Sequence, residues 1–81
     1  MLTAYLKVAL RRARYELLSD DGSFYGEIPD CPGVYSNATT LEACRDELEQ
    51  ALEDWVLFRV HRHLELPEFD GISLAVKEVA I

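Results

Sequence analysis

The sequence is 81 residues long, is 49% apolar and carries a net charge of −7. The length fits a single domain over residues 1–81, and the apolar share argues against a disordered chain. So small a core makes a dimer or higher oligomer an expectation. The apolar runs are too short to cross a membrane, no signal-peptide pattern opens the chain, and the two cysteines fall in no paired motif, so we expect a cytoplasmic protein.

The chain begins with an amphipathic stretch over residues 1–13 that predicts a short helix. Lys7 and Arg11 lie away from its apolar face. That face consists of Leu2, Leu6, Ala9, Leu10 and Ala13. We expect the helix to dock on the core, because the cations of this acidic chain are too few for a nucleic-acid contact.

A hairpin is expected next. Residues 15–19 and 24–28 are predicted strands, joined by an Asp-Asp-Gly-Ser turn in which Gly22 can take a positive φ. The loop Pro29–Gly33 follows, and it should be stiff because proline fixes φ. Residues 34–37 then form a short third strand.

Residues 39–66 predict one long helix, which would supply most of the core. Apolar residues recur there at three- and four-residue steps, the spacing of one helix face. They are Leu41, Cys44, Leu48, Ala51, Leu52, Trp55 and Val56. Thr39, three residues before Glu42, has the form of a capping box, and Pro67 marks the end. We expect Trp55 to be buried as the anchor of this helix on the sheet.

After a turn, residues 72–77 alternate apolar and polar side chains, which predicts a half-buried last strand. The order α-β-β-β-α-β indicates an α+β fold, in which a small sheet of three to four strands packs against one long helix. A strand that follows a long crossover helix can pair parallel to an earlier strand. The N-terminal helix is extra to this β-β-β-α-β core.

The run from Gly26 to Trp55 resembles a known family. It holds the loop P-D-C-P-G at 29–33, the helix start T-T-L-E-A at 39–43 and the stretch A-L-E-D-W at 51–55. It is similar to the HicB antitoxin domain, in which a hairpin ends in a P-D-x-P-G loop and the helix starts T-x-E-E-A and bears E-A-L-x-x-W. The resemblance covers roughly residues 15–79, and the combination of motifs is fairly specific.

The resemblance implies a small β-β-β-α-β fold, described as a reduced ribonuclease H-like fold. It also implies an antitoxin of a bacterial type II toxin–antitoxin system, which binds and silences a small basic HicA-type mRNA-cleaving toxin. Many family members carry a helix-turn-helix or ribbon-helix-helix domain after the last strand and bind their operator with it. This sequence ends after that strand, so we expect no direct DNA binding unless another chain provides it.

The charge distribution suits a basic protein partner. Eleven acids lie between Glu16 and Asp54, against Arg45 as the one base. Such a surface repels phosphate backbones and attracts a basic protein. We expect a toxin to contact the acidic hairpin and the loop after it. The candidate toxin-binding residues are Glu27, Asp30, Cys31, Pro32, Gly33 and Tyr35.

A second apolar stripe lies on the C-terminal half of the long helix, formed by Leu57, Val60 and Leu64. It lies opposite the side marked by Leu48 and Trp55, and a solvated helix does not normally expose three large aliphatic side chains. Either the N-terminal helix covers this stripe within the chain or another protomer does. We favour both, with these three residues as the candidate oligomer contact.

Two alternative functions are also consistent with the sequence. The first is an orphan homo-oligomeric interaction module of the same fold with no toxin partner, and the second, more remote, is a degenerate nuclease. A ribonuclease H-type nuclease needs carboxylates that converge on two metal ions. The candidates are Glu16, Asp20, Asp21, Glu27 and Asp30. No pair of them has metal-site spacing on one element, so we expect no enzyme, no metal and no cofactor.

Histidine and cysteine offer weaker signals. His61 and His63, two apart on a helix, point to different sides, so we expect them to be solvated or to cap the helix end. Cys44 lies on the core face of the long helix and should behave as a small apolar residue. Cys31 would be a reactive thiol only if a nearby cation or helix N-terminus lowered its pKa.

Overall fold

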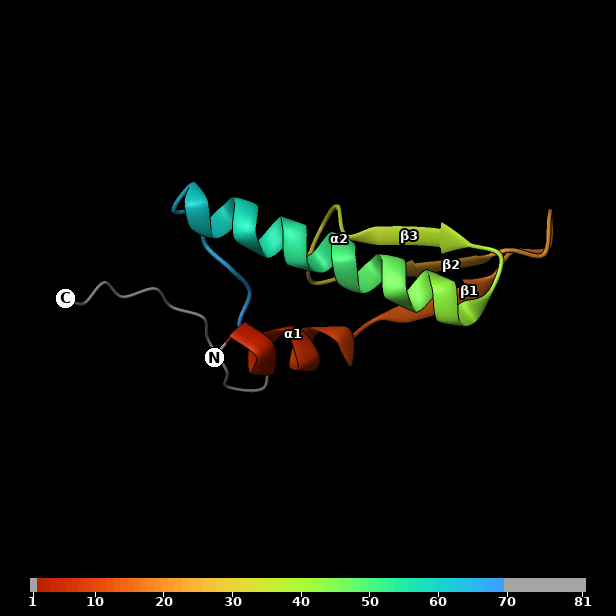
Figure 1. The fold of residues 1–81 in the computed structure, drawn as a ribbon, viewed down its shortest axis with the longest axis horizontal. Coiled ribbons are helices and arrows are strands. Elements are labelled where there is room, and N and C mark those ends of the chain that lie inside the picture. The colour runs from red at the N-terminus through yellow and green to blue at the C-terminus, as the bar shows by residue number, and fades with distance from the viewer. Residues whose placement is uncertain (1, 70–81) are drawn as a thin grey trace.

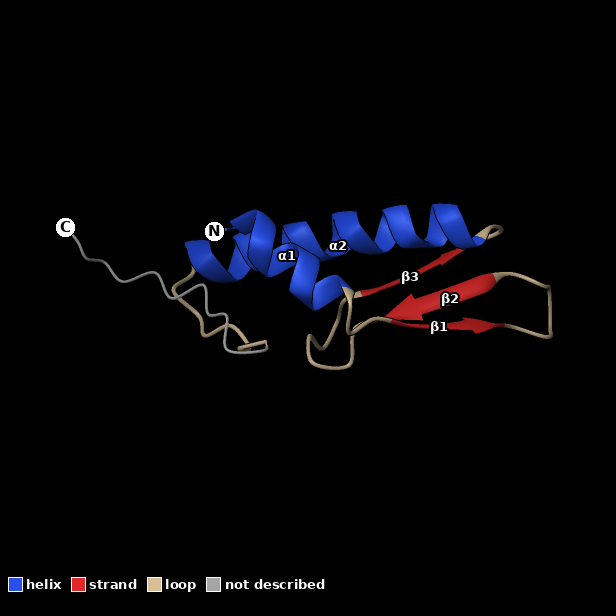
Figure 2. Ribbon diagram, turned by 90° about the horizontal axis from the view of Figure 1, so that it is seen from below, coloured by secondary structure: helices blue, strands red, loops and turns tan. Residues whose placement is uncertain are grey.

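The computed structural model describes residues 2–69, which form two helices and a three-stranded sheet. The elements are α1 (Leu2–Leu10), β1 (Arg14–Leu17), β2 (Phe24–Glu27), β3 (Tyr35–Ala38) and α2 (Leu41–His61). Both helices lie on one side of the sheet, and α1 lies beside the C-terminal half of α2 (Figure 1, Figure 2). The predicted α+β fold is therefore confirmed. The predicted last strand, residues 72–77, lies outside the described residues.

The sheet is antiparallel, in the order β1-β2-β3. Side chains on successive residues of a strand point to opposite faces, so its rows alternate between the helix side and the open side. The row Tyr15–Gly26–Ser36 lies on the helix side, where the Ser36 hydroxyl donates a hydrogen bond of 2.8 Å to the carbonyl oxygen of Cys44 in α2. This bond ties the edge strand β3 to the first half of α2.

α2 begins one residue later than its sequence pattern predicts. The N-cap is Thr40, not Thr39: its backbone is extended, and its hydroxyl accepts a hydrogen bond of 3.1 Å from the backbone N–H of Ala43. Thr39 and Thr40 both fit the N-cap pattern in the sequence. Thr40 is the N-cap because the helix begins at the next residue, Leu41.

α2 ends at His61, well before Pro67. Arg62 is the C-cap, and His63 has a φ of +57°, the left-handed conformation that ends many helices. Neither histidine is the C-cap, and both His61 and His63 are exposed, as the expectation of solvated side chains has it. At 21 residues the helix is about 31 Å long. Neither described helix is long and apolar enough to cross a membrane.

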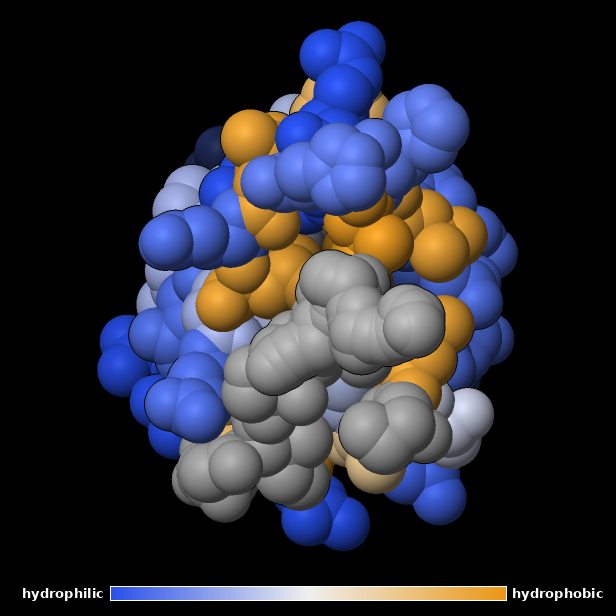
Figure 3. Space-filling model, turned by 90° about the vertical axis from the view of Figure 1, so that its left-hand side faces the viewer, coloured by the Kyte–Doolittle hydropathy of each residue, from blue (hydrophilic) through white to orange (hydrophobic). Residues whose placement is uncertain are grey.

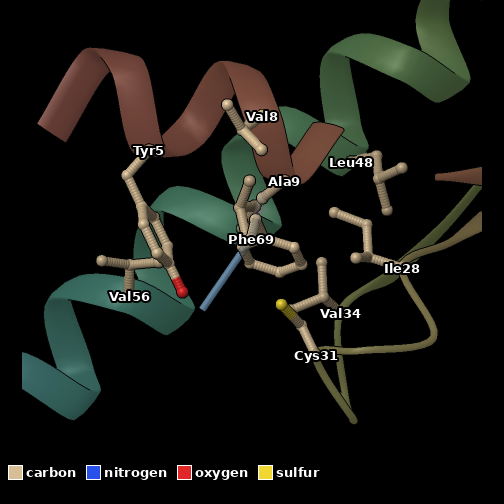
Figure 4. Close-up of a cluster of buried hydrophobic side chains, with 10 residues drawn as sticks. Tyr5, Val8, Ala9, Ile28, Cys31, Val34, Leu48, Val56 and Phe69 are labelled. Atoms are coloured by element: carbon tan, nitrogen blue, oxygen red, sulfur yellow. The ribbon is translucent and has the colours of Figure 1, made fainter. Parts of the chain in front are cut away.

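The core lies between α1, α2, the segment at 28–34 and Phe69, beside the end of the sheet (Figure 4). The straight ridge of α2 at four-residue steps is fully buried, with Cys44, Leu48, Leu52 and Val56 all 0% exposed. Three predicted core residues differ from expectation, and one of them, Ala51, is partly buried against the core cluster. Leu41 is 40% exposed, because it is the first residue of α2 and lies off this ridge, and Trp55 is only partly buried, at the edge of the core cluster.

α1 docks on the core, but its buried face is Tyr5, Val8 and Ala9. Of the predicted face only Ala9 is buried, and Leu2, Leu6, Leu10 and Ala13 are partly buried at its edge. Tyr5 packs edge-on against Phe69, with 5.4 Å between ring centroids, and its hydroxyl donates a hydrogen bond of 2.5 Å to the carbonyl oxygen of Pro67. Tyr5 therefore ties the start of the described chain to its end. Figure 4 shows its ring between α1 and Val56 of α2.

The second apolar stripe is covered only in part. Val60 is partly buried against the core cluster, whereas Leu57 and Leu64 are 50% and 44% exposed. Phe58, next to Leu57, is 52% exposed, and apolar side chains are visible at this end of the molecule (Figure 3). The role of the stripe as an oligomer contact stays a prediction.

Candidate partner-binding surface

No described helix covers the second face of the sheet, which we call the open face (Figure 2). Two rows of paired residues form it, because strand alternation turns them away from α2. The rows are Arg14–Glu27–Tyr35 and Glu16–Tyr25–Asn37. The open face therefore presents two tyrosine rings, two carboxylates, one guanidinium and one amide.

The two tyrosines of the open face form a stack. Tyr25 and Tyr35 have ring centroids 6.4 Å apart and an interplanar angle of 23°. The Tyr25 hydroxyl donates a hydrogen bond of 3.2 Å to a carboxylate oxygen of Glu27. Loss of solvent, followed by the Glu27 carboxylate, raises the pKa of Tyr25, so this hydroxyl stays a donor near neutral pH. Tyr35 is 62% exposed and offers most of its ring to a partner.

Asn37 connects β3 to the end of the open face next to the β1–β2 turn through two hydrogen bonds. Its side-chain amide donates one hydrogen bond of 2.7 Å to the carbonyl oxygen of Phe24 and another of 2.9 Å to the hydroxyl of Ser23. That hydroxyl in turn donates to Asp21 at 2.7 Å. The β1–β2 turn is thereby held to β3, which makes the open face rigid before any partner binds.

The loop Pro29–Gly33 is closed by its own backbone. The N–H of Cys31 donates to the carbonyl oxygen of Ile28 at 2.9 Å, and the N–H of Val34 donates to that of Cys31 at 3.0 Å. Gly33 has a φ of +99°, which a residue with a Cβ adopts only with strain. These bonds point Cys31 into the core and leave Asp30 and Pro32 at the surface.

A hollow of ≈ 310 Å³ lies between this loop and the second half of α2. Its lining is Asp30, Pro32, Trp55, Arg59, Glu65, Leu66 and Pro67. The Arg59 guanidinium lies 4.9 Å from the centroid of the Trp55 ring and donates a hydrogen bond of 2.8 Å to the carbonyl oxygen of Glu65. Trp55 is thus a wall of the hollow rather than the central core anchor that its sequence position suggests.

The six predicted toxin-binding residues lie in different places: on the open face, in or beside the hollow, and in the core. Glu27 and Tyr35 are a register pair on the open face. Asp30 and Pro32 line the hollow beside Trp55, where Asp30 also forms an ion pair of 3.1 Å with Arg12. Gly33 is exposed in the loop between these two places.

Cys31 is the exception, because it is 0% exposed and cannot touch a partner in this conformation. Burial, followed by the nearby Asp30 carboxylate, raises the pKa of its thiol to about 11. Both effects disfavour the thiolate, so the lowered pKa that a reactive Cys31 thiol would need is not found. Cys31 contributes to the core cluster instead.

Sequence reasoning missed Tyr25 and Glu16 as members of the surface. Strand alternation would have found Tyr25, since it lies two residues before Glu27 on the same strand. Glu16 could be assigned to this surface only from the register of the β1–β2 pair, which places it opposite Tyr25. The carboxylates considered for a nuclease site do not form a metal-binding cluster. No group of three metal-ligating side chains that could hold a metal ion occurs in the part of the chain that the structure describes.

The family model of the UPF0150-like proteins matches residues 4–67, which span all the described elements from within α1 to the segment after α2. The chain belongs to the UPF0150-like family. A comparison with curated proteins gave no match. Among solved structures, the chain is similar to TTHA0281 from Thermus thermophilus, with 43% identity, a TM-score of 0.89 and 95% of each chain covered.

The extent of the family match corrects the prediction that α1 is an addition to the fold. The match begins at residue 4 and so includes most of Leu2–Leu10. The N-terminal helix is therefore part of the family's pattern and not an addition to a β-β-β-α-β core. The packing agrees with this, because Tyr5 and Ala9 of α1 are fully buried.

Proposed function

We propose that this chain is a HicB-like antitoxin domain that binds and neutralises a small basic HicA-type mRNA-cleaving toxin through the open face. The UPF0150-like family to which the chain belongs is related to the HicB-like antitoxins. Relatedness alone does not identify a partner, so the proposal rests on the chemistry of the surface.

The observation that carries the proposal is the composition of the open face. Exposed tyrosines are enriched at protein interfaces, because each supplies a large, rigid contact area and a hydroxyl that can hydrogen-bond. Tyr35 provides such a ring, and Tyr25 supports it from the next strand. A folded monomer has no evident use for a rigid aromatic stack on an uncovered sheet face.

The charges of the open face favour a basic partner. Glu16 and Glu27 flank the tyrosine stack, and only Arg14 opposes them. The whole chain carries 15 acids and 8 bases, so its long-range field also attracts a cationic protein. Asp30 adds less to this attraction, because Arg12 lies 3.1 Å from it and offsets its charge.

The test is binding to a HicA-type toxin, first that of a short basic reading frame beside this gene. Purified full chain is titrated with the toxin in an isothermal calorimeter. Tyr35→Ala should weaken binding by about 2 kcal/mol, the typical cost of truncating an interface anchor. Glu27→Gln should slow association and reduce its salt dependence, because it removes a charge near the edge of the interface.

The matched control is Glu49→Gln, which removes the same charge from an exposed position on α2. We expect the control to bind the toxin as the parent chain does. If Glu49→Gln weakens binding while Tyr35→Ala and Glu27→Gln do not, the open face is not the toxin site. If no HicA-type toxin binds, the antitoxin proposal itself is wrong.

A second candidate function is a homo-oligomeric interaction module without a toxin. It is favoured by the exposed side chains of Leu57, Phe58 and Leu64 at the C-terminal end of α2. Three large exposed apolar residues in so short a segment are typical of a contact surface. Analytical ultracentrifugation of the chain mixed with a HicA-type toxin separates the two candidates, since a module of this kind would self-associate but would not sediment with the toxin.

A further inference from the structure

Three cations converge on a cavity at the junction of α1, β1 and α2. The cavity has a volume of ≈ 400 Å³, within the range of about 300–1,000 Å³ typical of small-molecule sites. Its lining is Lys7, Leu10, Arg11, Ala13, Tyr15 and Arg45. Lys7 lies in α1, and Arg11 follows directly after the helix, with its backbone N–H 3.2 Å from the carbonyl oxygen of Lys7. Arg45 comes from the second turn of α2.

None of these cations is neutralised by a carboxylate within residues 2–69, where the ion pair is that of Arg12 with Asp30. The chain has 15 acids against 8 bases, so carboxylates are abundant. The hollow is lined by Lys7, Arg11 and Arg45 and by no acidic residue, which favours a positive potential within it. That potential favours an anion in the cavity.

The aromatic wall of the cavity depends on a glycine. A Cβ on Gly26 would lie 2.9 Å from Cε1 of Tyr15 and 3.1 Å from the sulfur of Cys44, so glycine is what lets the Tyr15 ring lie close on β2. Burial raises the pKa of Tyr15, and the adjacent Arg45 guanidinium opposes that rise. The ring is thus fixed beside a cation, with Leu10 completing an apolar wall.

From this geometry we infer that the cavity binds a small phosphate monoester with an aromatic or apolar body. A phosphate monoester carries a charge of about −1.5 to −2 at neutral pH and three strong acceptor oxygens. The guanidinium groups of Arg11 and Arg45 can each donate paired hydrogen bonds to it, and Lys7 adds a point charge. The apolar body packs on Tyr15. This site lies on the helix side of β1 and is independent of toxin binding.

The probe is phenyl phosphate, titrated into the full chain at low salt by calorimetry and by amide NMR shifts. We expect saturable binding at one site, with shifts at Arg11, Tyr15 and Arg45. Inorganic phosphate should bind more weakly, because it lacks the apolar body, and phenol should not bind. Arg11→Gln and Arg45→Gln should each weaken phenyl phosphate binding about tenfold, the usual effect of losing one charged hydrogen bond.

Arg14→Gln is the matched control. It removes the same charge from an exposed residue beside the lining residues Ala13 and Tyr15, but Arg14 lines a different hollow with Glu16, Tyr25 and Glu27. We expect it to leave the affinity unchanged. Circular dichroism confirms that each variant is folded.

Four results would overturn the proposal. One is the absence of saturable phenyl phosphate binding, and another is equal weakening by Arg14→Gln, which would show general electrostatic attraction. Inorganic phosphate that binds as tightly as phenyl phosphate would exclude a ligand with an apolar body. A single-stranded oligonucleotide that binds more tightly than phenyl phosphate would point to nucleic acid instead.

Discussion

Thr39 and Thr40 stand side by side at the start of α2, and the hydroxyl of Thr40 satisfies the backbone N–H of Ala43. Thr40→Ala should lower the free energy of unfolding by about 1 kcal/mol, because it leaves that donor without its partner. Thr39→Ala is the matched control and should change little. Urea denaturation measures both, and the reverse order would place the helix start at Thr39.

Tyr5 should make the fold sensitive to alkali. Burial, followed by the nearby Cys31, raises the pKa of Tyr5 from 10.0 to about 12. The unfolded chain loses this proton near pH 10 and the folded chain keeps it to about pH 12, so this contribution to stability is complete below pH 10 and is lost as the pH rises to 12. Melting temperatures measured across this window should fall steeply.

The control for this effect is Tyr5→Phe, which has no proton to lose. It should be less stable at neutral pH, because the hydrogen bond to Pro67 is gone, but its stability should fall less between pH 10 and 12. Some slope should remain, since the pKa values of Cys31, Tyr15 and Tyr25 are raised as well. An equal slope in the variant and the parent would show that Tyr5 ionises alike in the folded and unfolded chains.

At the scale of the elements, local sequence predicts most of the fold. The hairpin, the third strand and the start of α2 lie close to their expected bounds, because strand alternation, Gly22 and the helical repeat are all local signals. The end of α2 does not, since the helix stops at His61 rather than at residue 66. The burial of Trp55 could not be predicted, because it depends on where the loop at 29–33 and the segment at 65–67 meet α2. Those contacts are set by tertiary structure.

The core of α2 offers a direct test of its buried ridge. Leu52 is 0% exposed, whereas Trp55 lies at the edge of the core cluster beside a hollow. Leu52→Ala should therefore cost about 2–5 kcal/mol, the range for a fully buried leucine. Trp55→Ala should cost less, because its ring already contacts solvent. Denaturant midpoints that place Trp55→Ala as the more damaging change would restore Trp55 as the anchor of the helix.

At the scale of the whole molecule, the open questions concern surfaces. The sequence predicts Glu27 and Tyr35 as partner contacts, and the register makes them neighbours. It does not predict the cavity of Lys7, Arg11 and Arg45, because these residues come from different elements and meet only through the docking of α1. Residues that are far apart in the sequence form no local sequence pattern, so their proximity in the fold cannot be predicted from it.

The apolar end of α2 is the predicted site of self-association. Leu57→Glu places a charge on a half-exposed residue, so it should break an oligomer while leaving the fold intact. Val60→Glu should damage the fold as well, because Val60 packs against the core cluster. Light scattering and circular dichroism on the same samples report both effects. A folded Leu57→Glu variant with the oligomeric mass of the parent chain would exclude this contact.

The most direct test of toxin binding by the open face is an NMR titration. The ¹⁵N-labelled full chain is mixed with an unlabelled HicA-type toxin, and the amide signals that shift or broaden are mapped on the structure. We expect them to cluster at Glu16, Tyr25, Glu27 and Tyr35, while the outer face of α2 around Glu49 is unaffected. Changes confined to α2 would contradict toxin binding by the open face, as would a spectrum that the toxin leaves unchanged.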